Sequence, residues 1–242
     1  MRAITYVAAC VPFILLTVGC NRIFGEHVRG QGDVEKKVLE VGTFHGIIVD
    51  GSMDVELTHG PLQSVVVEAQ PNIAALITTE VRDGIWTITT SKNFSTSKNL
   101  IIRISAPMID VVEIEGSGDV NGTNMFPGDA IRLGIDGSGG IDMAYDAKSL
   151  DASISGSGSI RITGSSTSLK LEVGGSGDID ARELRAVDAR ADISGSGNIS
   201  LHATGVVDAS VNGSGDIIIH GSPVDVRRNV RGSGEVRAVG AE

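Results

Sequence analysis

The sequence predicts an all-β protein, a parallel β-helix (solenoid) whose coils are about 19 residues long. The main observation is a repeat, because the tripeptide Gly-Ser-Gly recurs seven times in the second half of the chain. A fixed period of about 20 residues is typical of a chain that makes one coil per repeat. The copies begin at positions 116, 137, 156, 175, 195, 213 and 232.

Two columns of branched aliphatic residues accompany the repeat and support this fold. One column lies four positions after the first glycine of each copy, and the other lies two positions before it. Alternation with polar neighbours sends such side chains to one face of a strand, so both columns are predicted to fill the interior. The later column is Val120, Ile141, Ile160, Ile179, Ile199, Ile217 and Val236, and the earlier column is Ile114, Ile135, Ile154, Val173, Ile193, Val211 and Val230.

Each Gly-Ser-Gly is interpreted as a corner between two short strands. Glycine reaches backbone angles that other residues avoid, and it lets neighbouring coils approach closely. The seven serines are predicted to form a ladder of hydroxyls that satisfies polar groups at the corners. A catalytic serine needs one unique base and an oxyanion hole, so a set of equivalent serines does not indicate a nucleophile.

Residues 1–19 are predicted to be a lipoprotein signal peptide, because a short apolar stretch ends in small residues before Cys20. Cys20 would then carry lipid and Cys10 would be removed, which excludes disulfides, thiolate metal sites and a cysteine nucleophile. In a host with two membranes, Asn21 after the cysteine predicts transport to the outer membrane. An ordinary secretory signal and a short membrane anchor stay open as alternatives.

The mature chain is predicted to hold one continuous domain, residues 41–242, behind a flexible tether formed by residues 20–40. The tether is polar and charged, and we expect little order there. Residues 41–115 are predicted to form irregular coils and an N-terminal cap, and residues 116–242 the regular Gly-Ser-Gly β-helix. The formal net charge of −10 gives no electrostatic basis for binding nucleic acid.

The irregular part contains weaker signals of the same architecture. Asp83-Gly84 indicates a tight turn between strands, and Pro71 is suited to open one short helical turn. The segment that begins at Gly51 resembles a corner, so a degenerate coil is predicted there, about three periods before Gly116. Atypical terminal repeats commonly close a solenoid, so Trp86 is predicted to lie in the core or the cap. Predicted strands are 43–49, 53–57, 64–69, 78–81, 85–90 and 100–105.

These segments resemble the putative auto-transporter adhesin, head GIN domain family of bacterial surface proteins. The resemblance covers about residues 40 to 238 and rests on Phe44-His-Gly-Ile-Ile-Val-Asp50, Gly51-Ser-Met-Asp-Val-Glu-Leu57, Val81-Arg-Asp-Gly-Ile-Trp-Thr-Ile88 and the Gly-Ser-Gly motifs. It implies a single-stranded right-handed β-helix on an exported, often lipid-anchored protein. The motifs specify the family well and the activity poorly, because a fold does not determine a function.

Two polar patterns resemble parts of metal sites, but neither predicts one. Acidic residues follow several corners, as in calcium-binding β-rolls, but the period here is twice as long, so we interpret them as turn-forming carboxylates. His202 and His220 occupy equivalent positions on adjacent coils, yet a third ligand is missing. The sequence predicts no metal, no cofactor and no catalytic residue. The acidic residues are Asp119, Asp178, Asp216 and Glu235.

A cluster of arginines near the C-terminal end is the possible binding surface: Arg227, Arg228, Arg231 and Arg237. The last repeat stops within a few residues, and an uncovered end of a β-helix offers unpaired backbone groups. One hypothesis is that the arginines form a charged guard against end-to-end stacking. The other is that they form a docking site for an acidic partner or a glycan.

The function favoured by these observations is a non-catalytic, lipid-anchored cell-envelope protein with an adhesin-like β-helix. It would act as a surface binding or scaffold module for a glycan or another envelope protein. The alternative is a carbohydrate-active β-helix enzyme, a lyase or hydrolase that acts on acidic polysaccharide. Such enzymes need long loops that build a cleft, and the short returns in this repeat leave little room for one. An accessory role in envelope stress or assembly stays open.

Overall fold

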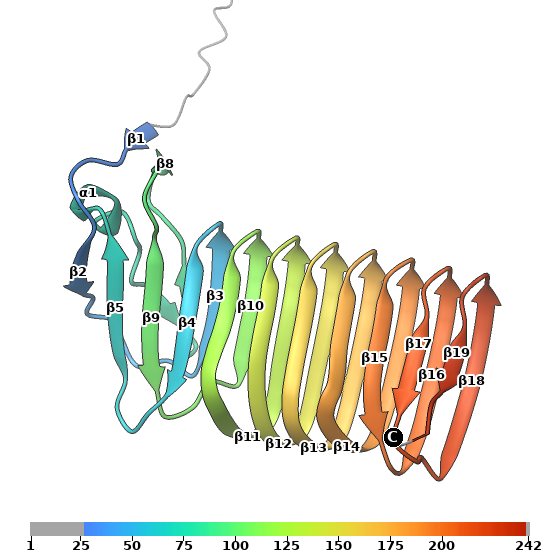
Figure 1. The fold of residues 1–242 in the computed structure, drawn as a ribbon. Helices are drawn as coiled ribbons and strands as arrows, with labels where there is room; N and C mark the ends of the chain where they lie inside the picture. Colours follow the sequence, from blue (N-terminus) through green and yellow to red (C-terminus); the bar gives the residue numbers. More distant parts are fainter. Residues whose placement is uncertain (1–26, 241–242) are drawn as a thin grey trace, which may run out of the picture.

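The computed structural model describes residues 27–240 and is a β-solenoid of about seven turns, which confirms the predicted fold class (Figure 1). Strands account for 69% of the chain and helix for 2%, so the protein is nearly all β. The predicted signal peptide and Cys20 lie outside the described residues. No helix within residues 27–240 is long and apolar enough to cross a membrane.

Strands that lead up to the first glycine of each corner form one long parallel layer, here called the front wall. Corner glycines of adjacent coils stand in register, as Gly116 does with Gly137 and Gly137 with Gly156. From the N-terminal end, the front wall consists of β7 (Ile85–Ile88), β3 (Gly46–Gly51), β10 (Val111–Gly116), the last parts of β11 (Asp119–Gly137), β12 (Gly140–Gly156), β13 (Ser159–Gly175) and β14 (Asp178–Gly195), then β16 (Val206–Gly213) and β18 (Asp225–Gly232).

Strands that follow the corners form the opposite layer, the back wall. It is parallel from β9 onward, and two antiparallel strands extend it at the N-terminal end. In spatial order, the back wall consists of β2 (Glu35–Val38), β5 (Ser64–Ala69), β9 (Ile101–Ala106), β4 (Asp54–His59), the first parts of β11 to β14, then β15 (Asn198–Ala203), β17 (Ile217–His220) and β19 (Val236–Ala238).

Both aliphatic columns point into the space between the walls, as predicted. Every member of the two columns is buried except Val230 in the last coil, which is 42% exposed. Ile218, which follows the later column, is partly exposed, as expected for an outward position. Alternate residues of each strand therefore build a continuous apolar core along the whole solenoid.

The corner glycines are required by contact between coils. At Gly156 φ is +136°, and a Cβ atom there would lie 2.3 Å from the carbonyl oxygen of Gly137 in the preceding coil. The main chain also joins the corners, since the Ser157 N–H donates to the same oxygen at 2.8 Å. The predicted hydroxyl ladder is wrong: the seven serines are exposed, and none of their hydroxyls bonds another described residue. Backbone bonds between coils already satisfy the corner, so the hydroxyls face outward.

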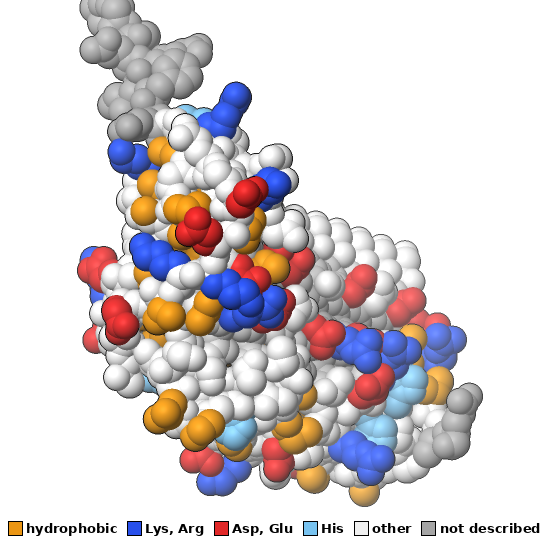
Figure 2. All heavy atoms as spheres, turned by 60° about the vertical axis from the view of Figure 1, so that its left-hand side comes forward, with side chains coloured by type: hydrophobic (Ala, Val, Ile, Leu, Met, Phe, Trp, Pro, Cys, Tyr) orange, Lys and Arg blue, Asp and Glu red, His pale blue; other side chains and the backbone are white. Residues whose placement is uncertain are grey.

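The N-terminal end is closed by a cap that the sequence predicted in outline. β6 (Val81–Arg82) and β7 form a hairpin through Asp83 and Gly84, which both have positive φ. Trp86 is fully buried against Phe44, and its Nε1–H donates to the carbonyl oxygen of Thr78 at 3.0 Å. The predicted helical turn is α1 (Pro71–Ala74). Figure 2 shows acidic and basic side chains interspersed over the outer surface of this end.

The order of coils at this end differs from the prediction. Gly51 pairs directly with Gly116, so β3 lies between β7 and β10 and no further coil separates the two corners. After β4 the chain leaves the solenoid axis, builds the cap and the outermost coil from β7 to β9, and returns to the other side of β3 at β10. The long sequence interval between Gly51 and Gly116 therefore encodes a cap and the outermost coil. It does not encode further coils between these two corners.

The expectation of little order between residues 20 and 40 is wrong for the described part of that segment. β1 (His27–Arg29) pairs with β8 (Asn93–Ser95), and β2 pairs antiparallel with β5. Lys36 also forms an ion pair with Glu68 at 2.8 Å. The polar composition suits an edge strand that faces water, and charged edge strands protect a sheet from further pairing. Composition alone did not distinguish such a strand from a tether.

Candidate functional site

An open groove with a volume of about 640 Å³ crosses the outer face of the front wall. Because the strands are parallel and in register, equivalent outward residues of successive coils lie about 4.8 Å apart in straight columns. Small residues in the middle coils leave the hollow. Its walls are two such columns, Glu113, Gly134, Ser153, Glu172, Asp192 and Ser210 in one and Glu115, Asp136, Ser155, Gly174, Ser194 and Asn212 in the other.

The groove is rich in hydrogen-bonding groups and acidic. Its lining residues include carboxylates, serine hydroxyls and one amide but no lysine, arginine or aromatic residue. Between the two polar columns it is also lined by the earlier aliphatic column, from Ile114 to Ile193. Two of the carboxylates are neutralised from the rim, where Lys170 lies 2.9 Å from Glu172 and Arg190 lies 2.7 Å from Asp192. The groove therefore offers both donors and acceptors to a hydroxyl-bearing ligand and repels a polyanion.

Two of the acidic residues after the corners, Asp178 and Asp216, have a structural role that the sequence did not reveal. Oδ1 of Asp178 accepts hydrogen bonds from the backbone N–H and the side-chain amide of Asn198, both at 2.9 Å. Asn198 accepts from the Asp216 N–H at 3.1 Å, and Asp216 accepts from the Glu235 N–H at 2.8 Å. These side chains link one coil to the next. Within residues 27–240 no group of three His, Cys, Asp or Glu could hold a metal ion.

The two histidines lie side by side on the back wall, as predicted from their spacing. His202 pairs in register with His220. A register shift between Ala181 and Arg185 makes Arg185 the residue that pairs with His202 in the preceding coil. This neighbour is a cation and adds no metal ligand.

Two titratable groups with shifted pKa values, Tyr145 and Asp180, serve the fold. Tyr145 is buried and its hydroxyl donates to the carbonyl oxygen of Ile109 at 3.1 Å. Burial raises the pKa of Tyr145, so this phenol stays protonated in its structural bond. The Arg182 guanidinium, hydrogen-bonded to Asp180, lowers the pKa of that carboxyl group. Both shifts have structural causes, and neither group is placed beside a nucleophile.

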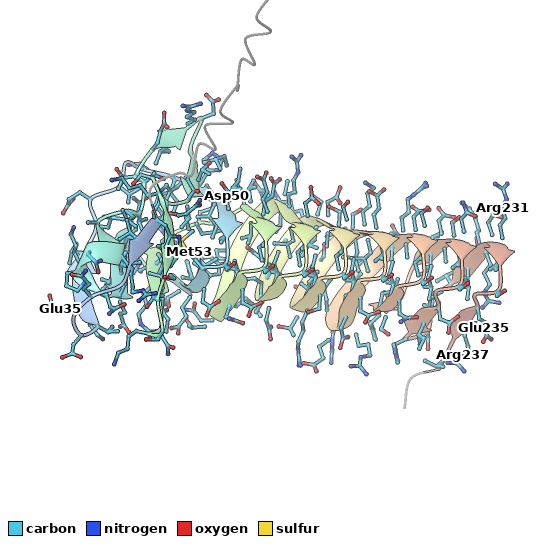
Figure 3. The ribbon with its side chains drawn as sticks, turned by 90° about the horizontal axis from the view of Figure 1, so that it is seen from above. Glu35, Asp50, Met53, Arg231, Glu235 and Arg237 are labelled. Carbon is cyan, nitrogen blue, oxygen red and sulfur yellow. The ribbon has the colours of Figure 1, made fainter. Side chains whose placement is uncertain are left out.

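The four arginines lie at the last coil but do not form one surface. Arg227 and Arg231 occupy outward columns of the front wall, and Arg228 continues the inward column of Ala209. Arg237 lies on β19 in the back wall, and Figure 3 shows Arg231 and Arg237 on opposite sides of this end. Arg227 forms ion pairs with Asp208 and Asp225, and the other three have no ion-pair partner among the described residues. The sequence placed them at the correct end, but alternation along the strands separates them.

Comparison with known proteins gives a consistent picture. The family described as putative auto-transporter adhesin, head GIN domain, matches residues 43–223. A crystal structure of a putative adhesin from Bacteroides fragilis is 25% identical, with a TM-score of 0.82, and covers 88% of this chain and 100% of that one. No curated protein matches the chain.

Two crystal structures from Parabacteroides distasonis share the fold. One is described as a putative adhesin (24% identity, TM-score 0.72) and the other as a putative lipid binding protein (23% identity, TM-score 0.72). Each covers 88% of this chain and 100% of its own.

Proposed function

The chain belongs to the putative auto-transporter adhesin, head GIN domain family, and from that premise we propose that it is a non-catalytic binding module of the bacterial cell envelope. The observation that carries the proposal is the groove on the front wall. It is open along its length, crosses the coils from β10 to β16 and is lined by hydrogen-bonding groups. Its binding surface thus comes from the repeat itself rather than from inserted loops.

The groove favours a neutral, hydroxyl-rich chain such as an uncharged glycan. Serine hydroxyls, carboxylates and the Asn212 amide can donate to or accept from sugar hydroxyls. The acidic lining opposes an acidic polysaccharide, which was the substrate class of the enzymatic alternative. Columns of similar groups spaced about 4.8 Å apart suit a polymer that presents the same unit repeatedly.

A lipid on Cys20 would attach the capped end of the solenoid to a membrane, the outer membrane in a host with two membranes. Only residues 21–26 separate Cys20 from β1 at His27, and such a segment spans at most about 20 Å. The solenoid axis runs away from the cap (Figure 1), so the groove and the last coil would extend away from the point of attachment.

The lipid anchor is tested by Cys20→Ser. Membrane fractionation and mass spectrometry of the N-terminal peptide are expected to show a lipid-modified Cys20 in the native protein and a soluble or uncleaved variant. An unmodified Cys20 in the mature native protein would contradict the anchor and leave the groove unaffected.

Binding is tested on a glycan array with the full chain, because β2 belongs to the back wall and cannot be removed with a tether. Neutral glycans are expected to bind, and the double substitution Asp136→Ala with Ser155→Ala is expected to weaken binding by about tenfold or more. Asp119→Ala, an exposed corner acid outside the groove, is the matched control. Binding of acidic glycans alone, equal loss in the control, or turnover of a polysaccharide would overturn the proposal.

A further inference from the structure

The last strand of the front wall has a free edge. β18 is eight residues long and pairs on one side with β16, and no described residue pairs with its other side. An edge strand presents a row of unpaired N–H and C=O groups, which is a template for another strand. The opposite end of the same wall differs, because β6 pairs with the outer side of β7, the first strand of the front wall.

The interior columns also end uncovered at β18. Val230 is 42% exposed, whereas Val211, its equivalent in the preceding coil, is 1% exposed. One more strand in register would cover Val230 in the same way that Val230 covers Val211. The edge thus combines unpaired backbone with two incompletely covered valines, Val226 and Val230, which flank the exposed Arg228 in the inward positions. An added strand of matching alternation would bury the two valines.

The charges on the outward columns indicate which side chains an added strand would carry. Adjacent coils in this fold are joined by ion pairs along a column, as between Asp151 and Lys170 at 3.3 Å and between Asp208 and Arg227 at 3.5 Å. This column ends on Arg227, which also pairs with Asp225 of its own strand at 3.2 Å. The next outward column ends on Asn229, and the one beyond it ends on Arg231. In the first and third of these columns the next residue would lie beside a guanidinium, which favours a carboxylate there.

We propose that the free edge of β18 binds an extended acidic polypeptide segment as an additional strand. Its carboxylates would lie opposite Arg227 and Arg231, and its alternate apolar side chains would cover Val230 and Val226. The segment is a polypeptide rather than a glycan because only a backbone can complete the ladder. A second copy of this chain would bring another arginine-bearing edge against this one, and the like charges oppose such a pair.

The proposal is tested by fluorescence anisotropy with the purified full chain and a labelled eight-residue peptide of alternating Asp and Val, matched in length to β18. We expect binding that weakens with added salt. The double substitution Arg227→Gln with Arg231→Gln is expected to weaken it by about tenfold or more. Arg132→Gln is the matched control, because Arg132 is exposed on the same wall and occupies the same column as Arg227, far from the edge.

A second peptide separates strand addition from charge attraction. Outward residues of each coil donate their N–H to the preceding coil, as Arg132 does to the Asp110 carbonyl oxygen at 2.8 Å. N-methylation of each aspartate keeps the carboxylates but removes these backbone donors, so binding is expected to be lost. Equal binding of the N-methylated peptide, equal weakening by Arg132→Gln, or failure of the first peptide to bind would each overturn the proposal. Self-association of the unliganded chain through this edge in sedimentation velocity would also overturn it and assign the edge to a second copy. Loss of glycan binding in the groove would leave this result unchanged, because the surfaces are separate.

Discussion

The two ends of the solenoid solve the same problem differently. Each end of a stack of coils leaves an apolar interior and a strand edge without a neighbour. At the N-terminal end an irregular segment of the chain forms a cap. Trp86 is buried in this cap against Phe44, and strands with charged side chains cover its outer surface. At the C-terminal end the regular repeat continues to β18 with Val230 and three arginines at the boundary. The repeat therefore encodes contacts between coils, and each end needs its own sequence.

The largest difference in stability between an interior coil and the edge coil is expected when an inward valine is replaced by a charged residue. Val211→Asp would bury an unpaired carboxylate between coils and reduce the free energy of unfolding by more than about 4 kcal/mol or prevent folding. Val230→Asp, in the same column one coil later, should cost less than about 1 kcal/mol because that side chain already reaches water. Chemical denaturation of both variants measures this, and equal losses would show that the last coil is covered.

The cap is expected to contribute strongly to stability. Trp86→Ala removes a fully buried indole and its bond to Thr78, and should cost about 3 to 5 kcal/mol. Val224→Ala, at an 86% exposed position beside the open end, should change the free energy of unfolding by no more than about 0.5 kcal/mol. A small effect of Trp86→Ala in urea denaturation would mean that the cap is an appendage of an independently stable repeat.

Corner glycines should differ between the first coil and the others. Gly156→Ala combines a strained φ with overlap on the preceding coil, for an expected cost of about 2 to 4 kcal/mol. At Gly51 φ is also positive, but the nearest atom to an added Cβ is the Met53 side chain at 3.8 Å. Gly51→Ala should therefore cost only about 1 to 2 kcal/mol. Thermal melts that rank the two variants in reverse would refute the contact argument.

The smallest difference between the two ends is expected for the loss of stability when an ion pair is removed. Arg103 contacts Glu56 and Glu68 beneath β2, and the Glu68 side chain is mostly buried, so Arg103→Met should cost about 1 to 2 kcal/mol. Arg227→Met removes exposed pairs and should cost no more than about 0.5 kcal/mol. If Arg227→Met proved the more damaging change in urea denaturation, the arginines of the last coil would be structural rather than available to a partner.

The sequence predicted the regular part of the fold well because every coil repeats one set of contacts. The inward columns and the glycine corners follow directly from that repetition. The first coil could be recognised at Met53, which replaces the second corner glycine and is buried. The next coil needs glycine at the equivalent position, because a Cβ at Gly118 would lie 2.2 Å from the Met53 carbonyl oxygen. Met53 itself has the outermost coil as its neighbour, and there the chain between β7 and β9 leaves the solenoid instead of forming a Gly-Ser-Gly corner.

The remaining features depend on contacts that no periodic signal marks. The position of β3 between β7 and β10 follows from how the cap folds back, and β2 resembles a polar tether until β5 is there to pair with it. The sequence analysis missed the groove because no single residue of its lining is distinctive. The absence of bulky side chains at neighbouring outward positions, from Gly134 to Ser194, was the only signal available for it.

Hydrogen–deuterium exchange of the full chain tests most directly the claim that one end is closed and the other open. Amides of β3, β4, β9 and β12 to β14 should exchange slowly, and those of β18 and β19 at least about tenfold faster than those of β16. The peptide of alternating Asp and Val should slow exchange in β18 without changing β9. Protection of β18 equal to that of β14 without a ligand, or rapid exchange in β7 and β9, would contradict the account.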